Sequence, residues 1–133
     1  MKTKMLLLFA LSISLIGFAQ KDEIKAATKA LNSGDAAAAK TALEGASGAI
    51  DGADAKVQAQ YYALLGDASK QLSDFDGAIN DYQKVVSIEE KSGKAKYSAD
   101  VQQKLGQMTG ELVNAAVDDN NNKKYSEAAT RLY

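Results

Sequence analysis

The sequence contains no cysteine, histidine, proline or tryptophan. The absence of cysteine and histidine excludes disulfide bonds, the common zinc sites, thiolate nucleophiles and any histidine-based catalytic triad. Catalysis would have to rely on carboxylates, lysines, tyrosines and hydroxyls, and no two carboxylates stand in a recognisable loop context. We therefore predict a protein that is not an enzyme, has no catalytic, cofactor-binding or metal-binding residues, and is stabilised by packing alone.

A strong charge of one sign is also lacking, because 16 basic and 17 acidic residues give a net charge of −1. Acids and lysines are interleaved along the chain, as where Asp81 precedes Lys84 and Glu90 precedes Lys91. No basic stripe is present to follow a phosphate backbone, so nucleic acid is not an expected partner. The 133 residues, 46% of them hydrophobic, suffice for one modest domain.

The first 19 residues have the layout of a secretory signal peptide. Lys2 and Lys4 precede an apolar run over residues 5–18, and Gly17 and Ala19 supply small residues before a cleavage site at Gln20. The run is shorter than the roughly 20 residues that a bilayer-spanning helix needs, so we expect no stable membrane insertion after cleavage. Lipidation at the cleavage site would need a cysteine, and the sequence has none, so a lipoprotein is not expected. The sequence thus predicts an exported protein, periplasmic or secreted, whose mature part is residues 20–133.

The mature part is predicted to be helical throughout, because good helix formers dominate it and no run of alternating β-branched residues suggests a strand. Glycine and polar clusters predict breaks at 32–35, 48–54, 73–74, 91–96 and 118–122. Ser73 and Asp76 have the spacing of a capping box and predict a helix start at Ser73. Lysines at 91, 94 and 96 are expected to be solvated.

Each predicted helix has one apolar face. The clearest stripe is in the third segment, at Val57, Tyr61, Leu64, Leu65, Ala68 and Leu72. A second follows in the fifth segment, at Val101, Leu105, Met108, Leu112 and Ala115. Tyr61, Phe75 and Tyr82 are expected in the core. Gly106 and Gly110 are expected at a close contact between helices, and the alternatives are a kink or groove that accepts a ligand's backbone, or a break in the helix.

The apolar pattern repeats along the chain. Ala39-x3-Leu43-x2-Ala46 matches Ala78-x3-Tyr82-x2-Val85, and Tyr125-x2-Ala128-x3-Leu132 begins the pattern again. The middle unit, with Leu65-Gly66 followed by Phe75 and Ala78-x3-Tyr82, resembles the tetratricopeptide repeat (TPR) family. Ser69 and Val85 depart from that family pattern. Together with the predicted signal peptide, the chain is similar to exported TPR proteins of Gram-negative bacteria, especially the Bacteroidota.

The resemblance implies an all-α, right-handed solenoid of antiparallel helix pairs. The pairs are expected at about 21–47, 56–90 and 98–133, with the last one incomplete. Gly66 is expected where two helices cross closely. The family implies a non-catalytic scaffold in the bacterial envelope that binds a protein or peptide partner on its concave face. On this chain the corresponding positions are Gln60, Ala63, Asp67 and Lys70, for which a solvated helix face is the alternative interpretation.

The last eleven residues, KKYSEAATRLY, form one apolar helix face with no partner in the sequence. Truncation of the chain is the favoured explanation, with an exposed last helix as its consequence. Two alternatives stay open: a helical N-terminal module of a larger exported enzyme or carbohydrate-binding protein, and self-association through this end. The preceding Asp118 to Asn122 echoes the start of a calcium loop, but Lys123 and Ala129 stand where glycine and glutamate are needed, so we expect a polar turn.

Overall fold

The computed structural model describes residues 20–121 and 130–132. The predicted signal peptide, and Tyr125, Ala128 and Ala129 of the chain end, lie outside the described residues. Leu132 is described, and its side chain is 61% exposed, in agreement with the exposed end that the sequence predicts.

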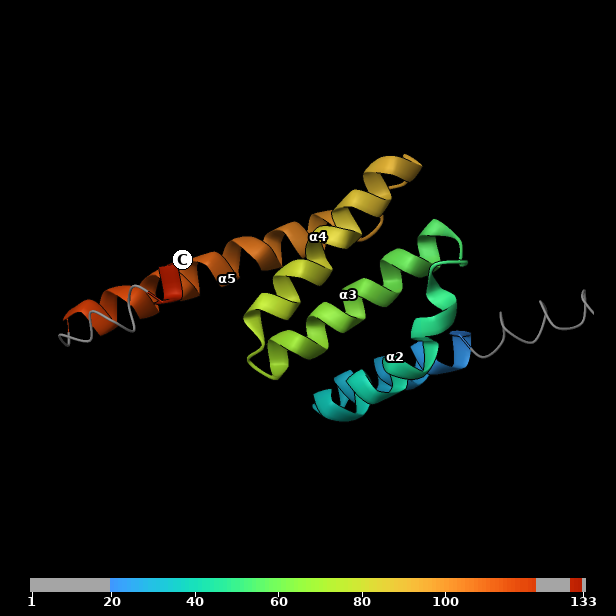
Figure 1. The fold of residues 1–133 in the computed structure, drawn as a ribbon, viewed down its shortest axis with the longest axis horizontal. Coiled ribbons are helices and arrows are strands. Elements are labelled where there is room, and N and C mark those ends of the chain that lie inside the picture. Colours follow the sequence, from blue (N-terminus) through green and yellow to red (C-terminus); the bar gives the residue numbers. More distant parts are fainter. Residues whose placement is uncertain (1–19, 122–129, 133) are drawn as a thin grey trace, which may run out of the picture.

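Every regular element in the described ranges is helical. Residues 20–32 form the first helix, and the others are α2 (Ala36–Ile50), α3 (Ala55–Gln71), α4 (Phe75–Ser92) and α5 (Ser98–Asn121). Helices that are adjacent in the sequence pack antiparallel (Figure 1), which confirms the all-α prediction. α5 continues past the start of α4, so its C-terminal part projects from the stack (Figure 1). Within the described ranges, none of the helices combines the length and hydropathy of a membrane span.

The core consists of two clusters that meet at α3. The first cluster joins residues 20–32, α2 and α3 through Ile24, Ala27, Ala39, Leu43, Ala46, Ile50, Tyr61 and Ala68. The second joins α3, α4 and α5 through Ala59, Ala63, Ala78, Tyr82, Val85, Val101 and Met108. Both copies of the repeated apolar pattern are therefore buried, as predicted, and α3 is the one described helix that contributes to both clusters. Leu72, the last residue of the predicted α3 stripe, is instead 45% exposed.

The same turn ends three helices, at Gly34, Ser73 and Gly93, and the first two of these turns lie 39 residues apart and lead directly into the next helix. Gly34 (φ 80°) and Ser73 (φ 62°) each adopt the left-handed conformation just after a helix. In each of these two turns the next backbone N–H returns to a carbonyl five residues earlier, from Asp35 to Ala30 and from Asp74 to Ser69, both at 2.9 Å. These bonds form a Schellman motif, which satisfies carbonyls at the helix end.

The prediction that Ser73 caps α4 is wrong by one residue. The side chain of Asp74 accepts a hydrogen bond from the N–H of Gly77 at 3.0 Å, and Asp35 does the same for Ala38 at 2.9 Å. A carboxylate can both accept this bond and interact with the positive end of the helix. Ser73 instead lies in the turn before the cap, in the left-handed conformation.

Gly66 occupies the close helix contact that the sequence predicts. A Cβ built on this residue would lie 2.5 Å from Cε1 of Tyr82 and 2.7 Å from its Cδ1. The absence of a side chain therefore allows the fully buried Tyr82 ring of α4 to lie against the backbone of α3.

Gly106 and Gly110 contradict the prediction of close packing. Both are exposed, and a Cβ built on either one would meet no atom within 4 Å. They lie on the side of α5 away from the buried Val101 and Met108. The spacing of small residues alone did not reveal which side of the helix is packed.

Two predicted breaks are displaced. α2 runs through Gly48 to Ile50, because Ile50 is 3% exposed and its burial extends the helix by a further turn. α5 runs through Asp118 to Asn121, where a turn was expected. That stretch contains neither glycine nor proline, so the backbone can remain helical although aspartate and asparagine are weak helix formers.

Candidate functional site

The four predicted partner-binding residues lie along α3, but they do not form a free surface. Gln60, Asp67 and Lys70 are half-buried. Ala63 is only 8% exposed and belongs to the second core cluster, so the expectation that all four are exposed is wrong for this residue. Ala63 shares this cluster with residues of both α4 and α5, among them Tyr82 and Val101.

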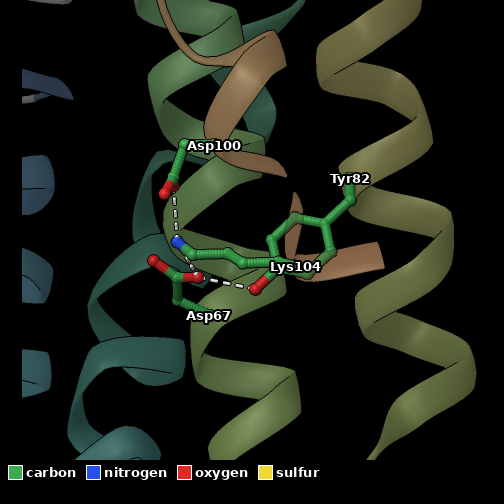
Figure 2. A network of polar contacts seen from close by, with 4 residues as sticks. All are labelled: Asp67, Tyr82, Asp100 and Lys104. Atoms are coloured by element: carbon green, nitrogen blue, oxygen red, sulfur yellow. Dashed lines mark hydrogen bonds and ion pairs between the residues drawn. The ribbon is translucent and has the colours of Figure 1, made fainter. Parts of the chain in front are cut away.

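Asp67 is the centre of a polar network that joins three helices (Figure 2). Its Oδ1 accepts a hydrogen bond from the hydroxyl of Tyr82 at 2.6 Å. The same oxygen forms an ion pair with Nζ of Lys104 at 2.8 Å. The same ammonium group lies 2.8 Å from Oδ2 of Asp100. The network thus links α3, α4 and the first turns of α5.

The position of Tyr82 depends on Gly66. The ring passes over the glycine, is completely buried and brings its hydroxyl to Asp67, one residue further along α3. Nζ of Lys104 lies 5.8 Å from the ring centroid, within the range of a cation–π contact. Close packing and the polar network therefore depend on one another at this point.

The pKa values of two groups in the network, Tyr82 and Lys104, are raised. Burial, followed by the hydrogen bond and negative charge of Asp67, raises the pKa of Tyr82 far above its usual value. Burial alone would lower the pKa of Lys104, but the hydrogen bonds to Asp100 and Asp67 outweigh it and the pKa is raised. Near neutral pH both groups remain protonated donors, so their hydrogen bonds to Asp67 and Asp100 join the three helices.

A second polar centre fixes the start of α5. Glu89, on α4, is 5% exposed. Its carboxylate accepts hydrogen bonds from the N–H groups of Lys96, Tyr97 and Ser98 at 2.8 to 3.1 Å, and from the Ser98 hydroxyl at 2.5 Å. Burial tends to raise the pKa of Glu89, but the hydrogen bonds from Ser98, Tyr97 and Lys96 outweigh burial and lower it. The carboxylate thus caps α5 from a neighbouring helix.

Asp81 is the other buried acid of α4, at 7% exposed, and it differs from Glu89. Burial raises the pKa of Asp81, and the nearby Lys84, 3.3 Å away, reverses this only in part. The side chain of Asp81 pairs with the half-exposed Lys84, whereas the carboxylate of Glu89 is surrounded by backbone donors. The cost of burying the carboxylate is therefore offset less completely at Asp81 than at Glu89.

The sequence analysis identified Asp67 but missed its partners Tyr82, Lys104 and Asp100, and it missed Glu89. The Asp100 and Lys104 pair has the i, i+4 spacing that favours an ion pair on a helix, and this was the one signal available. Nothing in the sequence distinguishes Glu89, which is buried, from its exposed neighbour Glu90.

Within the described ranges, no group of three or more acidic side chains is arranged to hold a metal ion. Comparison with family models, with curated proteins and with solved structures found no match to this chain.

Proposed function

We propose that the protein is a non-catalytic helical-repeat scaffold of the bacterial envelope, exported by its N-terminal segment, that binds a protein or peptide partner beside α3. One observation carries the proposal: the buried pattern Ala39, Leu43 and Ala46 recurs 39 residues later as Ala78, Tyr82 and Val85, with the same turn before each copy. Stacked repeats of this kind create extended surfaces, and binding is the usual role of such surfaces.

Within the proposed surface, the structure separates two kinds of residue. Asp67 and Ala63 hold the helices together, so their substitution would disturb the fold and the partner at once. Gln60 and Lys70 are half-buried and take no part in a side-chain hydrogen bond or ion pair in the described ranges. They are the positions at which partner contact can be tested separately from stability.

The test is site-specific photo-crosslinking in cells that export the protein. A photoreactive residue replaces Gln60 or Lys70 in the full chain, and the exposed Lys91 provides the control position. The proposal predicts a discrete crosslinked protein from positions 60 and 70 and none from position 91. Equal products from all three positions, or none from either α3 position, would contradict it.

A further inference from the structure

A hollow of about 600 Å³ lies between the start of α3 and the connection from α4 to α5. It is lined by Asp54, Ala55, Lys56, Glu89, Ser92, Lys94, Ala95 and Lys96. Its volume is within the range of sites that bind small ligands or short peptide segments. It is formed by a different part of α3 from Gln60 and Lys70.

Three lysines around the hollow lack an acidic partner. In the described ranges, Lys56, Lys94 and Lys96 make no ion pair, and all three are exposed. In the same ranges Lys40, Lys84 and Lys104 each lie within 3.6 Å of a carboxylate oxygen, and the remaining unpaired lysines lie outside the lining of the hollow. The three ammonium groups at the hollow are thus free to meet an external anion.

The two acids of the lining form no ion pair with these lysines, because backbone N–H groups occupy their carboxylates. Asp54 accepts from the N–H of Val57 at 3.0 Å as the cap of α3. Glu89 accepts from the N–H groups at the start of α5. Both carboxylates keep their charge, so the lining has a net charge of +1, and its unpaired ammonium groups are the ones that can bind an external anion.

The connection that carries two of the lysines is held in place. The N–H of Lys94 donates to the carbonyl oxygen of Glu89 at 3.2 Å, and the N–H of Lys96 donates to the Glu89 carboxylate at 2.9 Å. Nζ of Lys96 also lies 5.3 Å from the ring centroid of Tyr97. A segment anchored in this way loses little freedom when it binds a ligand.

We propose that this hollow is a binding site for an acidic peptide segment of a partner protein, with successive carboxylates paired to Lys56, Lys94 and Lys96. Lysines act as separate point charges, so three of them around a hollow suit a row of carboxylates along an extended chain. The lining contains no arginine, whose planar fork favours bidentate binding of one phosphate. The proposal concerns a second site and does not depend on the surface at Gln60 and Lys70.

The experiment measures the fluorescence anisotropy of labelled hexaglutamate titrated with the purified full chain at low salt. The K56Q/K94Q/K96Q variant removes the three lysines of the hollow. The K21Q/K25Q/K29Q variant is the matched control, because it removes the same charge from three exposed lysines of the first helix. Circular dichroism verifies that both variants keep the helical content of the native chain.

The proposal predicts saturable binding by the native chain, and binding about tenfold weaker or more in the K56Q/K94Q/K96Q variant, since each partly exposed ion pair contributes up to about a factor of five. The control variant should remain within about twofold of the native chain, because distant charges are screened. No binding by the native chain, or equal losses in the two variants, would overturn the proposal. So would inorganic phosphate that competes as well as unlabelled hexaglutamate, because the site would then be a general anion site.

Discussion

The dipeptide Leu-Gly occurs in α3, as Leu65-Gly66, and again in α5, as Leu105-Gly106, with opposite results. Gly66 is buried under the ring of Tyr82, whereas Gly106 is exposed and has open space where a side chain would be. The two leucines are both half-buried. The difference shows that the dipeptide permits close packing but does not create it, because a neighbouring helix must also bring a bulky side chain to the glycine.

The whole helices α3 and α5 also differ in how they are packed. α3 is packed by the first core cluster on one side and by the second on the other. In the described ranges, α5 contributes to the second cluster alone. Beyond that cluster Val113 and Val117 are 44% and 51% exposed, and Ala116, at 2%, is the one buried residue among the described side chains. α5 is therefore attached mainly at its start, through Glu89 and through the Asp67 network.

The largest expected effect comes from breaking the attachment of α5 at Glu89. Glu89→Gln should lower the free energy of unfolding by about 2–3 kcal/mol, because buried hydrogen bonds to a charged group are lost in part. Chemical denaturation measures the change. Glu90→Gln, at the exposed neighbouring position, is the control and should change stability by less than about 0.5 kcal/mol. Similar losses in the two variants would show that Glu89 has no special role.

The same site predicts a pH dependence. The pKa of Glu89 is lower in the folded protein than in the unfolded chain, so its ionised form stabilises the fold. This contribution is fully present above the unfolded-state pKa and is lost as pH falls through the folded-state pKa. Denaturation midpoints of the native chain should therefore fall on acidification more steeply than those of Glu89→Gln. Parallel curves for the two proteins would contradict the assignment.

The next effect tests the two glycines directly. Gly66→Ala should destabilise the fold by about 1–3 kcal/mol, because the new Cβ would overlap a buried tyrosine ring that its hydroxyl bond holds in place. Gly106→Ala should stabilise it by about 0.5–1 kcal/mol, because alanine is the better residue in an exposed helix interior. Thermal denaturation of the pair gives the sign of each change. Destabilisation by both substitutions would mean that α5 is packed on its open side.

A smaller effect is expected from Tyr82→Phe, which removes the bond to Asp67 and leaves the ring in place. We expect a loss of about 1–2 kcal/mol at neutral pH, the range for a partly buried hydrogen bond to a charged group. Because the pKa of Tyr82 is raised by folding, its contribution is complete below the usual tyrosine pKa of about 10 and declines from there as pH rises toward the folded-state pKa. The variant and the native chain should therefore converge in stability at high pH, and a constant difference would be inconsistent with the network.

The smallest effect sharpens the comparison of the two repeated turns. Ser73→Gly should stabilise the protein by about 0.5–1 kcal/mol, because a residue with a side chain is strained at φ 62°. Gly34→Ser, the reciprocal change, should destabilise it by a similar amount. If both substitutions leave the free energy of unfolding unchanged in urea denaturation, the left-handed backbone has no effect on the stability of either turn.

The sequence predicted the parts of the fold that depend on local pattern. The apolar spacing identified the buried residues Leu43, Tyr61, Tyr82, Val85 and Met108, and the glycine and polar clusters located most helix boundaries within a few residues. The Gly66 contact was also predicted correctly. These features follow from helical periodicity and from the special backbone of glycine, which neighbouring residues reveal.

The features that were missed depend on contacts between distant residues. Lys104 meets Asp67 across 37 positions, and Glu89 meets Ser98 only because α4 and α5 turn back on each other. Ala63 was expected on a free surface because a periodic pattern within α3 cannot show that α4 and α5 join it in one core cluster. Tertiary packing, and not propensity, decides which side of a helix is covered, and Gly106 was misassigned for the same reason.

The central claim is that α3 is packed on two sides and α5 is attached mainly at its start. Native-state hydrogen exchange of the full chain, followed residue by residue with NMR, tests it most directly. The account predicts the slowest exchange in α3 and α4, intermediate rates near Lys104, and fast exchange in α5 after Met108. Protection of α5 up to Asp118 equal to that of α3 would contradict it.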